Sequence, residues 1–211
     1  MQQQVLRAGP PLDSAQAAMI LVHGRGASAH DILFTTQPLE NPEFAYLAPE
    51  APGGAWYPQP FTAPLEANEP WLSQSLATIA GLVAEVERHL PAGRLMILGF
   101  SQGASLTLEF AARNPRRYGA IVGWSGGLIG ADGAQAERRG SLAGTPFFLG
   151  CSDVDPYIPA TRVLESARVL QSMGAEVDAQ IYPGMGHEVN ADEIHRVREL
   201  MARVLRREEV A

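Results

Sequence analysis

The sequence of 211 residues contains no lysine, so all 16 of its basic side chains are arginines. This absence excludes the phosphate-binding lysine of P-loop proteins, a Schiff base on lysine and a serine–lysine catalytic pair. Cys151 is the only cysteine, which rules out an internal disulfide and a cysteine-based metal cluster. Several large classes of enzyme are therefore excluded before any motif is considered, and no metal site is predicted.

Long hydrophobic runs are also missing, because no apolar stretch reaches the roughly 18 residues that a membrane span needs. The polar start of the chain, residues 1–9, does not have the composition of a signal peptide. We therefore expect a cytoplasmic protein without a membrane span. The formal net charge of -7 argues against nucleic acid as a partner, since binding to phosphates requires clustered positive charge.

Short apolar runs alternate with longer helical patterns along the chain. The runs are hydrophobic almost throughout, which is typical of parallel strands buried on both faces. This alternation predicts a single α/β domain over residues 1–211, with a doubly wound, mainly parallel sheet and helices on both faces. The expected strands are 18–23, 44–49, 95–100, 119–124, 146–150 and 177–183, the expected helices are 71–90, 102–113, 159–173 and 191–207, and the expected long loops are 49–70 and 125–144.

The pentapeptide GFSQG at residues 99–103 lies directly between a predicted strand and a predicted helix. A G-x-S-x-G sequence in this position forms a tight turn that projects the serine hydroxyl above the sheet. Side chains at Gly99 or Gly103 would clash where strand and helix approach each other. The pattern alone is common, but its placement here indicates that Ser101 is a nucleophile rather than a structural turn residue.

A serine hydroxyl is a weak nucleophile until a positioned imidazole accepts its proton. Two histidines follow Ser101 in the sequence. His187 lies in a glycine-rich turn after the predicted strand 177–183, whereas His195 lies in a polar helical pattern and is expected to face solvent. Because triad members in this arrangement follow successive strands, His187 is predicted to be the base.

The acid that orients His187 is expected in the loop after strand 146–150, which offers both Asp153 and Asp155. Position along the chain does not decide between them. Pro156 restricts the backbone of Asp155 and would hold its carboxylate stiffly, which favours Asp155. Asp153 could instead be a turn residue that accepts hydrogen bonds from local N–H groups.

The segment HGRGAS at residues 23–28 follows the first predicted strand and is expected to form part of an oxyanion hole. Two N–H donors are needed to stabilise a tetrahedral oxyanion, and we assign them to the backbone of Arg25 and Gln102. Their side chains remain available for other roles. His23 is expected to support this loop through hydrogen bonds, and the segment lacks the G-x-G-x-x-G spacing of a dinucleotide-binding loop.

Aromatic residues in the predicted loop 49–70 suit the wall of a substrate pocket, since such pockets are mostly apolar. Trp56, Tyr57 and Phe61, together with Met185 beside the predicted base, are therefore candidates for contact with substrate. Packing of these side chains against the core is the alternative interpretation.

Cys151 follows a predicted buried strand directly. It lies outside the strand-to-helix turn that holds the predicted nucleophile Ser101. Cys151 is therefore interpreted as a small packing residue.

Together these segments resemble the carboxylesterase/phospholipase family that includes the acyl-protein thioesterases. The resemblance implies an α/β-hydrolase fold without a large cap domain, no cofactor, and activity on small carboxylic esters or acyl thioesters. It also implies a triad of Ser101, Asp155 and His187. Members often form homodimers, so a homodimer is a further expectation. The matching segments are LVHGRGAS (21–28), APGGAWYP (51–58), LGFSQGASLTLEFA (98–111), GWSGGL (123–128), DVDPYIP (153–159) and YPGMGHEV (182–189).

Two features favour a bacterial-type esterase with a small or medium substrate over a protein-depalmitoylating enzyme. Gly26 is followed by Ala27 where eukaryotic members carry Asp, and Cys151 follows Gly150 where their acid loop usually contains His-Gly. A lysophospholipase or acyl-protein thioesterase is the alternative within the same chemistry. A non-catalytic binding protein on a hydrolase scaffold is the alternative from another class, and a nucleotide-binding protein would lack its glycine motif.

Overall fold

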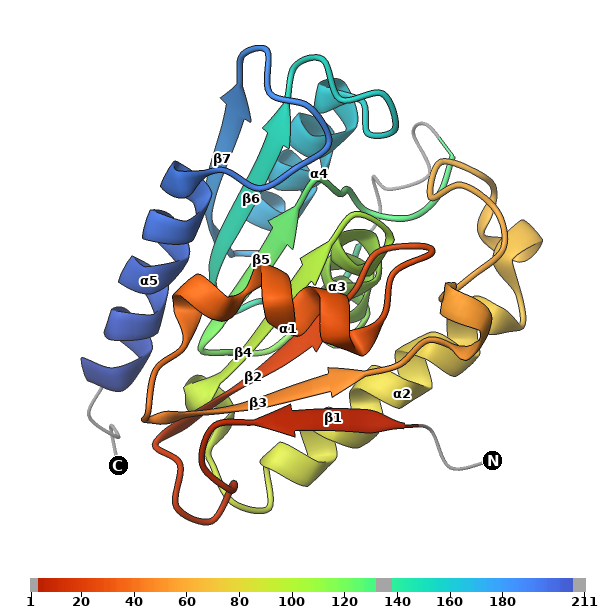
Figure 1. Ribbon diagram of the computed structural model, residues 1–211. Helices are drawn as coiled ribbons and strands as arrows, with labels where there is room; N and C mark the ends of the chain where they lie inside the picture. Colours follow the sequence, from red (N-terminus) through yellow and green to blue (C-terminus); the bar gives the residue numbers. More distant parts are fainter. Residues whose placement is uncertain (1–3, 132–137, 207–211) are drawn as a thin grey trace.

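A seven-stranded sheet forms the centre of the computed structural model, which describes residues 4–131 and 138–206 (Figure 1). The strand order is β1-β3-β2-β4-β5-β6-β7, in which β1 pairs antiparallel with β3 and every other pairing is parallel. The predicted mainly parallel α/β sheet is therefore confirmed. The strands are β1 (Val5–Ala8), β2 (Ala17–Val22), β3 (Phe44–Pro49), β4 (Leu95–Phe100), β5 (Ala120–Trp124), β6 (Pro146–Ser152) and β7 (Glu176–Tyr182).

Helices cover both faces of the sheet, α1 and α5 on one and α2, α3 and α4 on the other (Figure 1). None of the helices in the described part of the chain is long and apolar enough to cross a membrane. The helices are α1 (Ala29–Thr35), α2 (Trp71–Val86), α3 (Gln102–Arg113), α4 (Ala160–Ser172) and α5 (Ala191–Arg206), with short 3-10 turns at Gln37–Leu39, Pro52–Gly54, Leu65–Asn68 and Ala92–Arg94.

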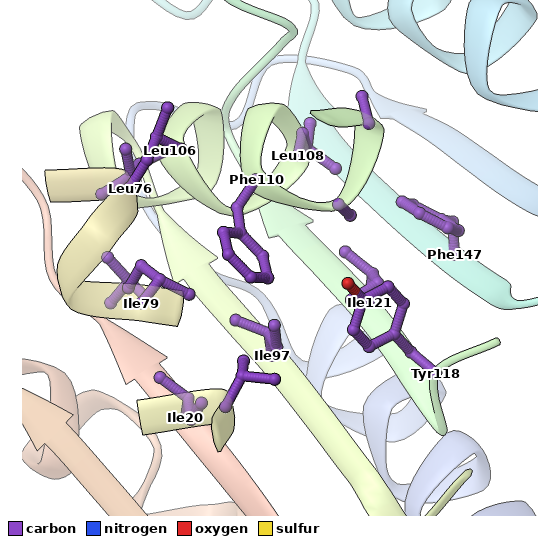
Figure 2. Close-up of a cluster of buried hydrophobic side chains, with 14 of the residues drawn as sticks. Ile20, Leu76, Ile79, Ile97, Leu106, Leu108, Phe110, Tyr118, Ile121 and Phe147 are labelled. Atoms are coloured by element: carbon purple, nitrogen blue, oxygen red, sulfur yellow. The ribbon is translucent and has the colours of Figure 1, made fainter. Parts of the chain in front are cut away.

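Two hydrophobic cores lie on the two faces because the central strands β2, β4 and β5 are buried throughout or nearly so. On one face, Phe110 of α3 points toward the sheet near Ile79 of α2 and Ile97 of β4 (Figure 2). On the other face, Ile32 of α1 and Met201 of α5 belong to the second core. Burying both faces explains why these strands are hydrophobic at nearly every position.

The register of the parallel strands aligns the loops that leave their carboxyl ends. Val22 at the end of β2 lies opposite Gly99 near the end of β4, and Phe100 lies opposite Trp124. The loops that follow β2 and β4 therefore emerge side by side. This edge of an open α/β sheet is where ligands usually bind.

Two elements were not predicted from the sequence. Strand β1 has only four residues at the sheet edge, too few to show a clear alternation. Helix α1 spans only seven residues, but Ser28 forms a reciprocal capping box with Asp31 at its start.

Some predicted boundaries also differ from the structure. Helix α2 ends at Val86 rather than residue 90. The loop predicted over 125–144 includes residues 132–137, and the helix predicted to end at 207 includes residue 207, which all lie outside the described residues.

Candidate active site

Ser101 occupies the sharp turn between β4 and α3. Its backbone has φ 55° and ψ −119°, a left-handed conformation that costs energy for any residue with a side chain. A Cβ on Gly99 would clash with the backbone of Gly103, and a Cβ on Gly103 would clash with the backbone of Val22. The two glycines of the pentapeptide are therefore required by the close approach of β4, α3 and the end of β2.

The three residues expected to form a triad are connected by hydrogen bonds although they come from distant parts of the chain. His187 Nε2 lies 2.9 Å from Ser101 Oγ, and His187 Nδ1 lies 2.7 Å from Asp155 Oδ2. Asp155 follows β6 and His187 follows β7, so successive strands bring them to the turn after β4. An imidazole with a carboxylate on Nδ1 can accept the serine proton at Nε2.

Two backbone N–H groups fix the carboxylate of Asp155. Its Oδ1 accepts hydrogen bonds from Tyr157 N at 2.9 Å and Ile158 N at 3.0 Å, which leaves Oδ2 for His187. Burial by itself would raise the pKa of Asp155, but the hydrogen bonds from His187 and from these two N–H groups outweigh it and lower the pKa. The acid is thus held in its charged form beside the imidazole.

Aromatic rings lie on two sides of the imidazole of His187. The ring of Phe100 is tilted against it with centroids 4.9 Å apart, and Tyr157 meets it edge-on at 5.0 Å. Tyr157 is 70% exposed, so its ring covers the imidazole from the solvent side. Tyr157 was not predicted to lie at the site; its position two residues after the predicted acid Asp155 is the sequence feature that could have indicated it.

The loop after β2 lies against the nucleophile, where an oxyanion hole would have to be. A Cβ built on Gly24 would lie 3.3 Å from Ser101 Cβ, so Arg25 follows directly beside the serine. Within residues 4–131 and 138–206, no acceptor takes the backbone N–H of Arg25 or of Gln102. Both N–H groups are therefore available for an oxyanion, and Gln102 N belongs to the first turn of α3.

His23 is buried and holds this loop by hydrogen bonds at both ring nitrogens. Ala51 N donates to His23 Nε2 at 3.0 Å, so the ring proton lies on Nδ1, which donates to Gly24 O at 2.7 Å. Its backbone carbonyl also accepts from Trp56 Nε1 at 2.8 Å. The predicted supporting role of His23 agrees with these contacts.

The side chain of Gln102 forms hydrogen bonds with the aromatic loop, the segment 49–70 that carries Trp56, Tyr57 and Phe61. Its Oε1 accepts from Trp56 N at 2.9 Å and its Nε2 donates to Tyr57 O at 2.8 Å. Ser75 Oγ of α2 donates to Trp56 O at 2.6 Å. The aromatic loop is thus attached to α2 and α3 by hydrogen bonds as well as by packing.

A cleft of about 690 Å³ opens above Ser101 and His187. Its volume is in the range of sites for small organic molecules. Of the four residues expected to contact substrate, Tyr57 and Phe61 line this cleft. The cleft is lined by Arg25, Tyr57, Pro58, Gln59, Pro60, Phe61, Ser101, Gln102, Ser105, Pro156, Tyr157, Ile158 and His187.

Trp56 and Met185 differ from the expectation that they line the cleft. Trp56 is only 1% exposed and packs its ring against His23 with centroids 5.0 Å apart, so it belongs to the core. Met185 Sδ lies 2.9 Å from Asn190 Nδ2 and is not part of the cleft wall. The sequence identified the aromatic loop, but the direction of each side chain depends on tertiary contacts.

The residues considered as alternatives lie outside the hydrogen-bonded triad. Asp153 Oδ1 accepts from Gly184 N at 2.7 Å, which ties together the loops that carry Asp155 and His187. His195 is on the exposed surface of α5, 3.6 Å from Glu199.

Cys151 is buried, and its Sγ lies 3.9 Å from Asp155 Oδ2. Burial and the nearby Asp155 raise the pKa of its thiol to about 12, which keeps it protonated and unreactive. In the described parts of the chain, no group of three or more His, Cys, Asp or Glu side chains could hold a metal ion.

Comparison with known proteins agrees with the fold and shows the family. The sequence profile of the phospholipase/carboxylesterase family matches residues 7–205, so the chain belongs to this family of α/β-hydrolases. A phospholipase/carboxylesterase structure from Dyadobacter fermentans has 40% sequence identity and a TM-score of 0.90, covering 95% of this chain and 97% of that one.

More distant relatives include acyl-protein thioesterases. Acyl-protein thioesterase 1 of Saccharomyces cerevisiae is 27% identical over 213 residues, covering 90% of this chain and 93% of the relative. Acyl-protein thioesterase 2 of Zea mays shares the fold, with a TM-score of 0.74 at 21% identity over 96% of this chain and 99% of that one. The family therefore supports hydrolysis of carboxylic esters or thioesters.

Proposed function

We propose that the protein is a serine carboxylesterase that hydrolyses small or medium carboxylic esters, and thioesters of similar size, through an acyl-enzyme. The observation that carries this proposal is the continuous hydrogen-bonded chain from Ser101 through His187 to Asp155 at the base of an open cleft. Membership of the phospholipase/carboxylesterase family supports the same reaction class.

In the first half of the proposed reaction, Ser101 Oγ attacks the carbonyl carbon while its proton passes to His187 Nε2. Asp155 stabilises the resulting imidazolium through Nδ1. The tetrahedral intermediate collapses when His187 gives the proton to the departing alcohol or thiol, which leaves an acyl group on Ser101. In the second half, water attacks the acyl-enzyme by the same route and releases the carboxylic acid.

The backbone N–H groups of Arg25 and Gln102 stabilise the negative oxygen of both tetrahedral intermediates. Support comes from their lack of other acceptors among the described residues and from the position of Gln102 at the start of α3. Removal of one such donor typically raises the barrier by about 3 kcal/mol. Because these are backbone groups, a change of either side chain leaves the donors in place.

The proposed preference for a small or medium acyl group rests on the sequence features at Ala27 and Cys151 that differ from the eukaryotic members. The cleft of about 690 Å³ offers Tyr57, Phe61 and Ile158 as apolar lining for the acyl part. Its volume alone would also admit a longer chain, so the chain-length optimum is the quantity to measure.

The proposal is tested by measuring hydrolysis of p-nitrophenyl esters from acetate to palmitate, with the matching acyl thioesters in parallel. Ser101→Ala is expected to lower kcat/KM at least about a thousandfold while circular dichroism stays unchanged. Ser172→Ala, which changes an exposed serine at the end of α4, is the matched control and should retain full activity. Labelling with a fluorophosphonate followed by peptide mass spectrometry should modify Ser101.

Each other outcome points to a different conclusion. Activity or labelling that survives in Ser101→Ala would overturn the assignment of the nucleophile. An optimum at palmitate would favour the long-chain lysophospholipase or thioesterase alternative. Absence of activity on every ester and thioester, together with no labelling, would favour a binding protein on a hydrolase scaffold. The cytoplasmic location and the homodimer expected from the sequence stay predictions.

A further inference from the structure

Arg25 places a positive charge in the wall of the cleft that also contains the nucleophile. Its neighbour Gly24 is in close contact with Ser101, and the Arg25 side chain lines the cleft together with Tyr57 and Gln59. The chemistry proposed above uses only the backbone N–H of Arg25. Its guanidinium therefore has no role in the proposed acyl transfer itself.

The guanidinium is held in position by neutral carbonyl groups. Arg25 Nη2 donates to Tyr57 O at 2.7 Å and to Gln59 O at 3.2 Å. The loop that supplies these carbonyls is itself fixed, because Gln102 Nε2 donates to Tyr57 O and Gln59 N donates to Asn68 Oδ1 at 2.8 Å. Both contacts use Nη2, whereas a guanidinium has five N–H donors, so Nη1 and Nε remain for a ligand.

Among residues 4–131 and 138–206, no acidic side chain in the cleft wall balances Arg25. The lining residues include neither Asp nor Glu, and within the described residues Arg25 forms no ion pair. Carbonyl partners orient a guanidinium but do not neutralise it. An oriented cation in a cleft attracts an anionic group and binds a carboxylate through charge-assisted hydrogen bonds.

We infer that Arg25 makes the enzyme select esters or thioesters that carry a free carboxylate, such as half-esters of dicarboxylic acids. The side chain would bind the carboxylate while the backbone N–H of the same residue stabilises the oxyanion. This inference rests on the proposed esterase function and adds a class of substrate to it. Recognition of the carboxylate would give an anionic substrate a higher kcat/KM than a neutral substrate of the same size and reactivity.

The test compares matched anionic and neutral substrates in the same enzyme. p-Nitrophenyl hemiadipate and methyl p-nitrophenyl adipate place the carboxylate in the acyl part, whereas 4-acetoxybenzoate and 4-acetoxybenzamide place it in the leaving group. The measured quantity is the ratio of kcat/KM for the anionic member to that for the neutral member. When this ratio is compared between variants, differences in intrinsic reactivity cancel.

For at least one substrate pair, Arg25→Gln is expected to lower this ratio about tenfold, the size expected for a hydrogen bond to a charged group near solvent. Arg25→Lys keeps the charge and should restore most of the ratio. Added salt should lower the ratio in the wild type, because it screens the attraction. Arg198→Gln is the matched control: Arg198 is also held by a carbonyl, Pro38 O, but lies on α5 outside the cleft wall, and its loss should leave the ratio unchanged.

Ratios that stay within twofold of the wild type for both pairs in Arg25→Gln, while neutral esters are still hydrolysed, would overturn this inference alone. The same fall in Arg198→Gln would also overturn it, because net charge rather than Arg25 would then explain the preference. Absence of hydrolysis of every ester by the wild type would instead mean that the proposed function has failed.

Discussion

Two hollows at opposite ends of the sheet contain arginine side chains, but these arginines have different partners. The cleft lies at the carboxyl ends of the strands, whereas a groove of about 470 Å³ lies between the beginnings of β6 and β7 and residues 196–206 of α5. In the groove, Arg203 forms two hydrogen bonds to the carboxylate of Glu176, at 2.7 and 2.6 Å. In the cleft, the partners that Arg25 has among the described residues are backbone carbonyls.

Whether an acidic side chain neutralises the arginine determines whether its charge is available for a ligand. Three acidic and three basic side chains line the groove, so their charges cancel, and Arg196 there is paired with both Asp178 and Asp192. A neutralised arginine joins secondary-structure elements, as Arg203 joins α5 to β7. Arg25 has no acidic partner in the part of the chain that the structure describes, so its charge is available for a ligand. We therefore expect changes in the cleft to alter activity and changes in the groove to alter stability only.

The largest expected effect is the loss of activity in Asp155→Asn. The amide cannot accept a hydrogen bond from His187 in the same way as the carboxylate, and it does not stabilise the imidazolium. We expect kcat/KM for a short-chain ester to fall about a thousandfold or more. Asp153→Asn is the matched control from the same loop, and because Asp153 bonds Gly184 N rather than His187, it should lose no more than about tenfold.

A reversed order for these two variants would show that Asp153 orients the base. A loss of the same size in a groove variant such as Arg203→Gln would contradict the division between a catalytic cleft and a structural groove. Circular dichroism and thermal unfolding of each variant separate a catalytic loss from misfolding.

Much of the fold could be predicted because its determinants are local. The buried parallel strands are hydrophobic throughout, and the turn at Ser101 requires glycines on both sides, so strand, turn and helix were predicted within a residue or two. The short edge strand β1 and the seven-residue helix α1 could not be predicted from periodicity. Elements this short derive their stability from neighbours in the fold rather than from their own pattern.

The site shows the same division between local and tertiary determinants. Ser101 and His187 stand at recognisable turns, and Pro156 favours Asp155 over Asp153. Position along the chain does not separate the two acids, however, and the hydrogen bond to His187 is what distinguishes them in the structure. The burial of Trp56 and the position of Tyr157 over the imidazole depend on contacts between loops from different strands. Sequence pattern identifies which loops form the cleft, whereas tertiary packing decides which of their side chains face it.

An intermediate effect is expected in helix α5, which begins near the cleft and ends at the groove. Glu193 is buried at its start, where Oε2 accepts from Asn190 N at 2.9 Å and Oε1 has no partner among the described residues. Burial raises the pKa of Glu193 to about 7 from its usual value of 4.5. The folded state therefore binds more protons than the unfolded state between these values, and stability falls as the pH rises through this range.

Glu193→Gln removes this titration but keeps an oxygen that can accept from Asn190 N. The free energy of unfolding of the variant, relative to the wild type, should therefore increase by about 3 kcal/mol between pH 4.5 and pH 8. Asp192→Asn provides the control: hydrogen bonds from Arg196 and Tyr182 lower the pKa of Asp192 from its usual value of 3.8, so the stability that its charge contributes is lost only as the pH falls below about 4. Between pH 4.5 and pH 8 the difference between this variant and the wild type should therefore stay constant. Urea unfolding at several pH values measures both; a difference for Glu193→Gln that does not change with pH would contradict the predicted titration.

The smallest effect is expected in the groove, where the Arg203–Glu176 pair is the counterpart of Arg25. The pair is partly exposed, with side chains 38% and 58% accessible, so solvent screens much of its attraction. A double-mutant cycle with Arg203→Gln and Glu176→Gln should give a coupling energy below about 1 kcal/mol, measured by urea unfolding at low salt. Ester hydrolysis and the preference for carboxylate substrates should be unchanged in all three variants. A changed preference would show that the groove, despite its cancelled charges, influences the cleft, and the comparison between the two arginines would no longer hold.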